Sequence, residues 1–190
     1  MATSPAASNL TLPRLGWALT GSGHFLVESF ALMRRIPHLD VFLSKAADEV
    51  LRMYKLDDQF DTLSPGSRVF RDQSASAVPV GNFYKGQYHT LVLGPATSNT
   101  VAKCVFGISD TLPTNVFAQA GKCRVPAIVF ACDTAPEMDT EAPKGWFKVY
   151  PRPIDLENTA RLRAFPGTTV VETLAEFEQV LTARLAEVEG

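Results

Sequence analysis

Two polar segments of this sequence have the residue types that bind a phosphate group. The longer one, Pro95-Ala96-Thr97-Ser98-Asn99-Thr100, follows the apolar residues Val92 and Leu93 and precedes a helical pattern. We expect the pair Gly94-Pro95 to end the strand, because proline donates no ladder hydrogen bond. Hydroxyl and amide side chains cap a helix start, and the free N–H groups there favour an anion. The pattern predicts an anion site formed by Pro95, Ala96, Thr97, Asn99 and Thr100.

A similar turn lies near the N-terminus, where the apolar run Leu15 to Leu19 leads into Thr20-Gly21-Ser22-Gly23-His24. Gly21 and Gly23 allow a tight turn and a close approach to a ligand, and Ser22 can cap a helix or bind a phosphate. Leu26 stands where a dinucleotide fingerprint has its third glycine, so a mononucleotide fits better than NAD. Each turn alone is also compatible with plain capping. Two such turns in one small domain favour a ligand.

Three other positions have two open interpretations each. His24 is expected at the first helical turn, either as a capping or surface residue or as a catalytic group beside the glycine turn. Ser44 and Lys45 are either a helix N-cap followed by a solvated lysine or part of the ligand site. Lys103 lies either on the phosphate side of its helix or in solvent. Cys104 and Cys132 have apolar neighbours, which predicts buried, inert thiols.

Apolar runs alternate with helical patterns along the chain, which positions these residues. The alternation predicts an α/β fold: a three-layer, doubly wound, Rossmann-like parallel sheet with helices on both faces and a ligand at the carboxyl ends of its strands. In one of the helices, Val101, Val105 and Ile108 are expected to form an apolar stripe. Strands are expected at 15–19, 40–43, 68–70, 90–93, 127–131 and 169–171, and helices at 24–35, 45–54, 97–109, 114–120 and 174–187.

Composition limits the class of protein. The 190 residues are 46% hydrophobic and 20% charged, and 18 basic against 20 acidic residues give a net charge of −2. We therefore expect one globular domain over residues 15–190 after a flexible tail of residues 1–14, and neither a nucleic acid nor a membrane as partner. The tail lacks the pattern of a signal peptide. Three cysteines cannot pair completely and lack metal-site spacing, which predicts a cytoplasmic protein without a metal.

Several motifs together resemble a known family. They are Thr20-Gly21-Ser22, Leu43-Ser44-Lys45-Ala46, Pro95 to Thr100 and Gly107-Ile108-Ser109-Asp110-Thr111-Leu112. In these motifs the chain resembles the homo-oligomeric flavin-containing cysteine decarboxylase superfamily of flavoproteins, over about residues 15–134. The stretches 41–54, 81–103 and 107–120 are most similar to its dihydromethanopterin reductase (acceptor) branch. The resemblance implies FMN as cofactor, with Ser44 as a hydroxyl contact to the flavin or its ribityl chain.

The sequence departs from the superfamily after the strand predicted at 127–131. Decarboxylating members carry Pro-x-Met-Asn-x-x-Met there, and flavin prenyltransferases carry an Arg-Glu-Thr-Pro-like run, whereas this chain reads Ala131-Cys132-Asp133-Thr134. The decarboxylation motif is missing, and Asp133 would repel a prenyl phosphate. The resemblance therefore implies an oxidoreductase that passes electrons through FMN to the C=N bond of a dihydropterin. In this hypothesis Asp133 binds the pterin, and His24 or a water supplies the proton.

The partners are expected from the resemblance as well. Without a ferredoxin-like cysteine run, electrons must come from an external donor, which is NAD(P)H, a flavodoxin or a ferredoxin. Superfamily members form trimers with the flavin between subunits, often within larger shells, so Asn115 and its neighbours are expected to complete a neighbour's site. An FMN-binding redox carrier or regulatory protein and a flavin-dependent decarboxylase or prenyltransferase relative are the alternative functions.

Overall fold

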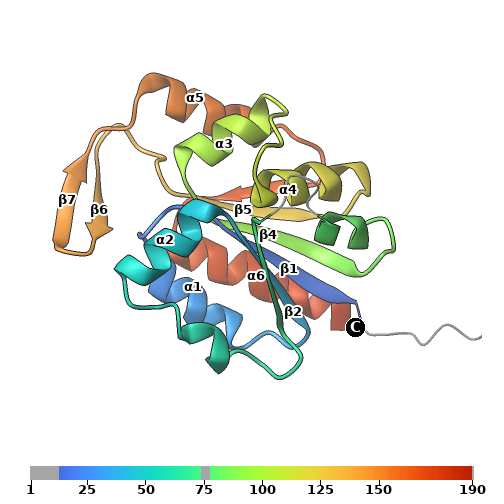
Figure 1. Cartoon of the computed structure of the whole chain (residues 1–190). Coiled ribbons are helices and arrows are strands. Elements are labelled where there is room, and N and C mark those ends of the chain that lie inside the picture. Colours follow the sequence, from blue (N-terminus) through green and yellow to red (C-terminus); the bar gives the residue numbers. More distant parts are fainter. Residues whose placement is uncertain (1–12, 74–77, 190) are drawn as a thin grey trace, which may run out of the picture.

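A computed structural model describes residues 13–73 and 78–189, which are built around a six-stranded parallel sheet (Figure 1). The strand order is β3-β2-β1-β4-β5-β8, so the order reverses between β1 and β4. The doubly wound α/β prediction is thereby confirmed. The strands are β1 Arg14–Leu19, β2 Leu39–Leu43, β3 Arg68–Arg71, β4 Tyr88–Ala96, β5 Ala127–Ala131 and β8 Thr168–Val171.

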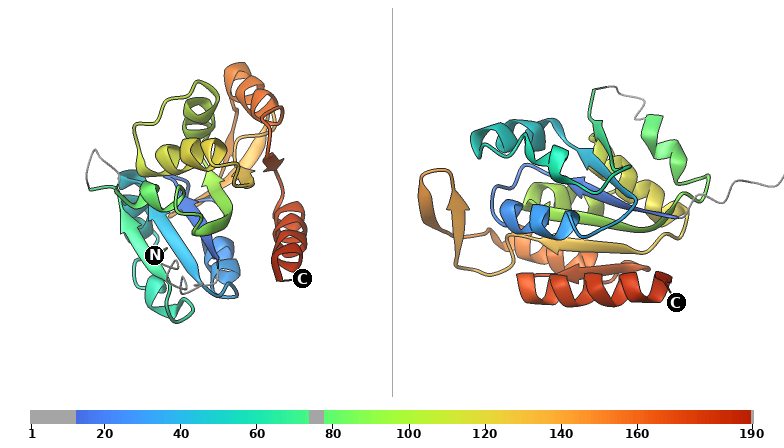
Figure 2. Two further views of the ribbon diagram at one scale, coloured as in Figure 1. Left: turned by 90° about the vertical axis from the view of Figure 1, so that its right-hand side faces the viewer. Right: turned by 90° about the horizontal axis from the view of Figure 1, so that it is seen from below.

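Helices cover both faces of the sheet, and Figure 2 shows α1 and α6 on one side of it. Buried side chains of α1, α2 and α6 share one hydrophobic cluster, and those of α3, α4 and α5 share the other. The helices are α1 Leu26–Met33, α2 Lys45–Met53, α3 Ser98–Val105, α4 Leu112–Lys122, α5 Pro153–Leu162 and α6 Leu174–Glu189, with short 3-10 turns at Gln59–Thr62 and Val78–Asn82.

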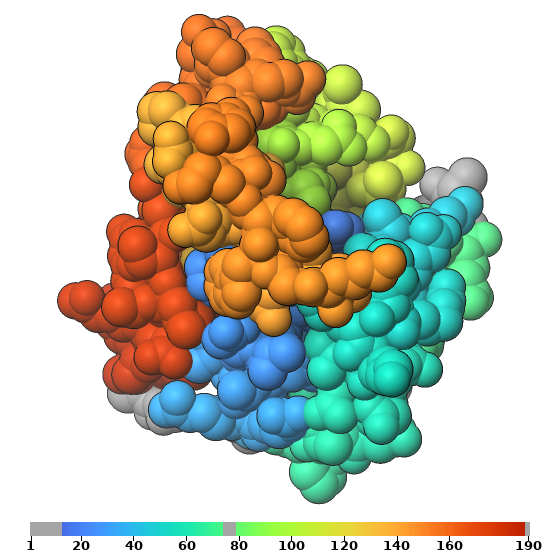
Figure 3. Space-filling model, turned by 90° about the vertical axis from the view of Figure 1, so that its left-hand side faces the viewer, coloured from blue at the N-terminus to red at the C-terminus, as the bar shows by residue number. Residues whose placement is uncertain are grey.

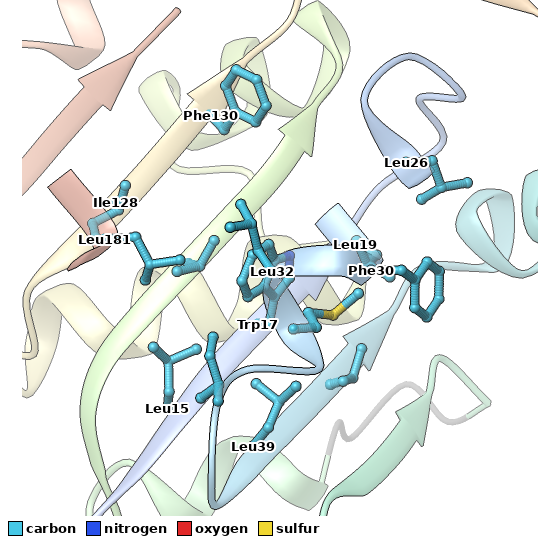
Figure 4. Close-up of a cluster of buried hydrophobic side chains, with 14 of the residues drawn as sticks. Leu15, Trp17, Leu19, Leu26, Phe30, Leu32, Leu39, Ile128, Phe130 and Leu181 are labelled. Atoms are coloured by element: carbon cyan, nitrogen blue, oxygen red, sulfur yellow. The ribbon is translucent and has the colours of Figure 1, made fainter. Parts of the chain in front are cut away.

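Side chains of the central strand β1 point alternately into the two hydrophobic clusters. Leu15, Trp17 and Leu19 of β1 point into the cluster drawn in Figure 4, whereas Ala18 belongs to the other one. Because parallel strands are buried on both faces, such strands are apolar almost throughout. The Trp17 indole N–H donates to the carbonyl of Gly94 at 2.7 Å, which satisfies a polar group inside this core.

The β4 strand is longer than expected. It continues through the cis Gly94-Pro95 bond to Ala96, so the prediction that this pair ends the strand was wrong. The ladder to β5 shifts register between Leu93 and Ala96, which accommodates the proline, and the amide of Cys132 donates to the Ala96 carbonyl at 3.0 Å. Proline is compatible with a strand at such an irregularity.

Helix boundaries also differ from the prediction. The α3 helix ends at Val105, and Gly107 with φ of 70° follows, so Ile108 is 47% exposed and does not extend the stripe of Val101 and Val105. The α1 helix begins at Leu26, which places His24 before the helix and not in its first turn. Phe177 and Leu181 of α6 are buried in the core.

An antiparallel hairpin follows β5 and was not anticipated. Its strands are β6 Met138–Ala142 and β7 Gly145–Val149, and it projects from the body of the protein beside α2 (Figure 1). The sequence predicts no element between 131 and 169, because the charged side chains and adjacent aromatics of this segment give no core pattern. Trp146 and Phe147 are exposed.

At the N-terminus the structure describes the chain from residue 13. Arg14 belongs to β1 and pairs with Asp40 at 2.7 Å, while residues 1–12 of the expected tail lie outside the described residues. Among the described residues, none of the helices combines the length and the apolar character that a membrane crossing needs.

Candidate functional site

A cavity of about 660 Å³ lies at the carboxyl ends of β1 to β4, where the fold predicts a ligand. Six of the residues expected from the sequence line it. They are Gly21, Ser44, Lys45, Thr97, Asn99 and Thr100. The remaining lining residues are Ala46, Asp72, Gln73, Lys103, Asp110, Thr111 and Pro113. The two polar turns identified in the sequence therefore meet at one cavity.

Three helices begin at this cavity. Ser44 caps α2 by accepting from the Ala47 amide at 2.9 Å, and Thr97 caps α3 by accepting from the Thr100 amide at 3.2 Å. Thr111 caps α4 in a reciprocal capping box with Thr114. The positive ends of three helix dipoles meet here beside several hydroxyl groups, which favours a bound anion such as a phosphate.

Charged side chains at the cavity are balanced. Lys103 donates to both carboxylate oxygens of Asp110, at 2.9 and 2.8 Å, so it lies at the cavity and not free in solvent. Asp72 accepts from the Leu112 amide at 3.0 Å and thereby holds the start of α4. Asp72, Asp110 and Thr111 were missed as site residues. Asp72 directly follows β3, and ligands bind at the carboxyl ends of parallel strands, so its position in the sequence could have identified it as a site residue.

Asp133 lies just after β5, outside the residues that line the cavity. Its Oδ2 accepts from the amide of Ser98, the first residue of α3, at 3.2 Å. A carboxylate at this position compensates the helix dipole and fixes where α3 begins. Asp133 is half-buried, and it connects the end of β5 to the polar turn that precedes α3.

The glycine turn has two different neighbours. Gly21 lines the cavity, and a Cβ there would lie 2.9 Å from the Cβ of Ala46. Gly23 faces the protein instead, because a Cβ there would overlap the hydroxyl and ring of Tyr54. The expectation that Gly23 admits a ligand is corrected accordingly: its missing side chain makes room for a tyrosine. Ser22 is buried and accepts from the Cys132 thiol at 3.3 Å.

His24 is buried beside this turn. Its Nδ1 accepts from the backbone amide of Glu141 in β6 at 3.3 Å. Burial lowers the pKa of His24, and the nearby acids Glu141, Glu28 and Asp133 oppose that shift. Phe25 follows in the left-handed region with φ of 63°, which is strained for this residue type. Strain of this kind is concentrated at functional sites.

Five of the expected cofactor contacts do not line the cavity, namely Ser22 and Gly23 of the glycine turn and three others. Pro95 and Ala96 are buried within β4, and the side-chain amide of Asn115 donates to the Thr111 carbonyl at 3.0 Å. The thiols behave as expected, since Cys104 and Cys132 are buried and desolvation raises the pKa of each to about 12.

Comparison with known proteins identifies the class of protein that this fold and cavity define. Residues 3–189 match the Flavoprotein family, so the chain belongs to that family. A dihydromethanopterin reductase (acceptor) of Methanosarcina mazei is 39% identical over 145 residues, which is 70% of this chain and 61% of that protein. This chain therefore spans less than two thirds of that relative's length. An uncharacterized protein of Methanocaldococcus jannaschii is 35% identical and covers 88% of this chain and 94% of its own length.

Solved structures agree with this classification. The structure of Burkholderia xenovorans DmrB in complex with FMN, described as a cubic protein cage for redox transfer, is 51% identical with a TM-score of 0.86. The match covers 95% of this chain and 99% of that one. The FMN-dependent cysteine decarboxylase TvaF has a TM-score of 0.63 at 20% identity, over 95% of this chain and 100% of its own, and shares the fold.

Proposed function

We propose that this protein is an FMN-dependent oxidoreductase that reduces the C=N bond of a dihydropterin. Dihydromethanopterin is the substrate, and tetrahydromethanopterin is the product. The observation that carries the proposal is the cavity at the start of α2, α3 and α4, in a chain that belongs to the Flavoprotein family. The names of the relatives that are 39% and 51% identical, a dihydromethanopterin reductase and an FMN-binding redox protein, support the same reaction.

The cavity fits the polar part of FMN. The start of α2 suits its phosphate best, since the Ser44 hydroxyl satisfies only one amide of that helix. At the start of α3, Thr97 and Asp133 satisfy the amides of Thr100 and Ser98, so the amide of Asn99 between them is the one that faces a ligand without a side-chain acceptor. Thr100, Thr111 and Asn99 supply hydroxyl and amide groups for the ribityl chain. When bound, FMN supplies a two-electron redox centre that can deliver a hydride.

Asp133 and His24 are the proposed catalytic residues. Asp133 orients the pterin, because a carboxylate can accept hydrogen bonds from ring N–H and amino groups. Its existing bond to the Ser98 amide fixes its position relative to the cofactor site. His24, or a water beside it, provides the proton that the substrate nitrogen gains as its carbon is reduced.

Electrons come from outside the chain. Its three cysteines are free, and the described residues contain no group of side chains suited to a metal. NAD(P)H, a flavodoxin or a ferredoxin is the donor. Free thiols also suit a reducing compartment, so the proposed location is the cytoplasm.

The active form is an assembly of trimers within a larger shell, in which Asn115 and its neighbours approach the site of an adjacent subunit. The related cage structure supports such an assembly. Exposed apolar side chains that a subunit contact would cover, Phe106 at 57% and Ile108 at 47%, support it as well.

The test is anaerobic stopped-flow absorbance. The FMN-loaded protein is reduced and then mixed with dihydromethanopterin. Rapid, saturable return of the flavin band is expected, and a flavin that stays reduced would reject the pterin as substrate.

Asp133→Ala should slow this half-reaction far more than flavin reduction, and an equal loss in both would remove Asp133 from substrate binding. Asn99→Ala should weaken FMN retention on desalting, and full retention would remove Asn99 from the site.

A further inference from the structure

One residue fastens the β6–β7 hairpin to the body of the protein. The amide of Glu141 donates to His24 Nδ1 at 3.3 Å, and its carbonyl accepts from the Tyr54 hydroxyl at 3.0 Å. Tyr54 directly follows α2, and His24 follows the turn after β1. Figure 3 shows the hairpin lying across this side of the molecule, with its end against the region of α2. The backbone of Glu141 is therefore held from both sides.

This arrangement determines where the proton of His24 lies. A backbone amide is only a donor, so the imidazole nitrogen that faces it must accept. A neutral imidazole carries one proton, and with Nδ1 as acceptor that proton is on Nε2. We propose that Tyr54 is a positioning residue that, through Glu141 of the hairpin, holds His24 in the Nε2–H tautomer. Its catalytic consequence rests on the proposed function: only Nε2 of His24 can donate toward the substrate.

The packing around His24 supports a single ring orientation. The Phe25 ring lies against it with centroids 3.7 Å apart, and the Trp146 ring of the hairpin meets it edge-on at 5.4 Å. Gly23 leaves the space that Tyr54 fills. The turn after β1 therefore lines the cofactor cavity at Gly21 and contacts the hairpin at His24.

The charged groups around His24 define how this contact responds to acid. Glu28 of α1, Asp133 after β5 and Glu141 of β6 favour a protonated ring, whereas burial opposes it. Protonation would place a second N–H on Nδ1, opposite the Glu141 amide, and the hydrogen bond would be lost. Acidification should consequently release the hairpin at Glu141.

The test is magic-angle-spinning NMR of the full-length, FMN-loaded protein labelled with [15N]histidine, which works for an assembly of any size. The chain has three histidines, and a His24→Gln sample identifies the His24 signals. We expect a protonated Nε2 and an unprotonated Nδ1 in the wild type, and a mixture of tautomers in Tyr54→Phe. A wild-type His24 with its proton on Nδ1 would overturn the proposal. A Tyr54→Phe spectrum identical to the wild type would remove the role of Tyr54.

Hydrogen exchange measured by mass spectrometry gives a second readout on the same samples. Tyr54→Phe should speed exchange in the peptide over residues 138–149 by about 2- to 12-fold, the factor that corresponds to one lost hydrogen bond. The matched control is Tyr84→Phe, whose side chain is 71% exposed. Equal exchange in Tyr54→Phe and the control would overturn the hairpin contact. FMN retention is measured separately: a protein that binds no FMN would refute the proposed function and leave the tautomer result standing.

Discussion

Replacing Gly23 by alanine should destabilise the protein through Tyr54. The glycine has no positive φ, so its backbone suits alanine, yet the new Cβ would overlap the tyrosine hydroxyl and the ring carbons Cζ and Cε2. Displacing the ring adds overpacking of about 1 to 3 kcal/mol. It also breaks the hydrogen bond to Glu141, which contributes about 0.5 to 1.5 kcal/mol. The free energy of unfolding should fall by about 1.5 to 4.5 kcal/mol.

A double-mutant cycle tests the cause. Gly23→Ala, Tyr54→Ala and the double variant are compared by urea unfolding followed by circular dichroism, at one protein concentration and without FMN. In the Tyr54→Ala background the Cβ has room, so Gly23→Ala should cost less than about 1 kcal/mol, with a coupling of about 2 kcal/mol. If the full cost persists in that background, the clash with Tyr54 is not the reason for glycine at this position.

The remaining predictions concern the sheet and its helices. Asp40 is fully buried and accepts from Arg14, Arg68 and Tyr88 at the amino end of the sheet, so Asp40→Asn should lower stability by about 3 kcal/mol in thermal unfolding. Asp48 is only half-buried and pairs with Arg52 and Arg71 at the surface, so Asp48→Asn should cost less than about 1 kcal/mol. Equal effects of the two substitutions would contradict the buried network. Burial, and then Arg184, lowers the pKa of His89 to about 4 from 6.5. The unfolded chain therefore takes up a proton below pH 6.5 that folded His89 does not, and stability should decline between pH 6.5 and 4. His89→Gln should flatten that decline in melting midpoints and His38→Asn should not; an unaltered slope in His89→Gln would refute the assignment.

Local patterns predicted the fold and half of the cavity. The roles of these residues depend on neighbours close in the chain, so the sequence alone indicates them. This holds for the apolar runs of β1, β2 and β5 and for the helix caps Ser44 and Thr97. The place of Gly23 was misread because the atom that requires it belongs to Tyr54, about thirty residues away. The continuation of β4 through Pro95 depends on a register shift against β5, which no local pattern specifies.

The hairpin and the roles of acids were unpredictable for the same reason. Residues 138–149 contain four charged side chains and two adjacent exposed aromatics, so the segment shows no core pattern, and Glu141 is held through its backbone, which carries no sequence signal. Asp72 and Asp133 each serve a helix from a different part of the chain, α4 and α3. The sequence shows that both acids follow strands, but it does not show which helix each one contacts.

The cavity is assembled from five short stretches that are separated by as much as ninety residues and follow four different strands. No single stretch forms the cavity. The cavity exists only after β3, β2, β1 and β4 have paired side by side. A ligand there recognises the completed sheet alone, so loading adds RT ln(1 + [L]/Kd) to the stability of the whole domain. The availability of the ligand would thus decide how long each newly made chain survives unfolding and proteolysis.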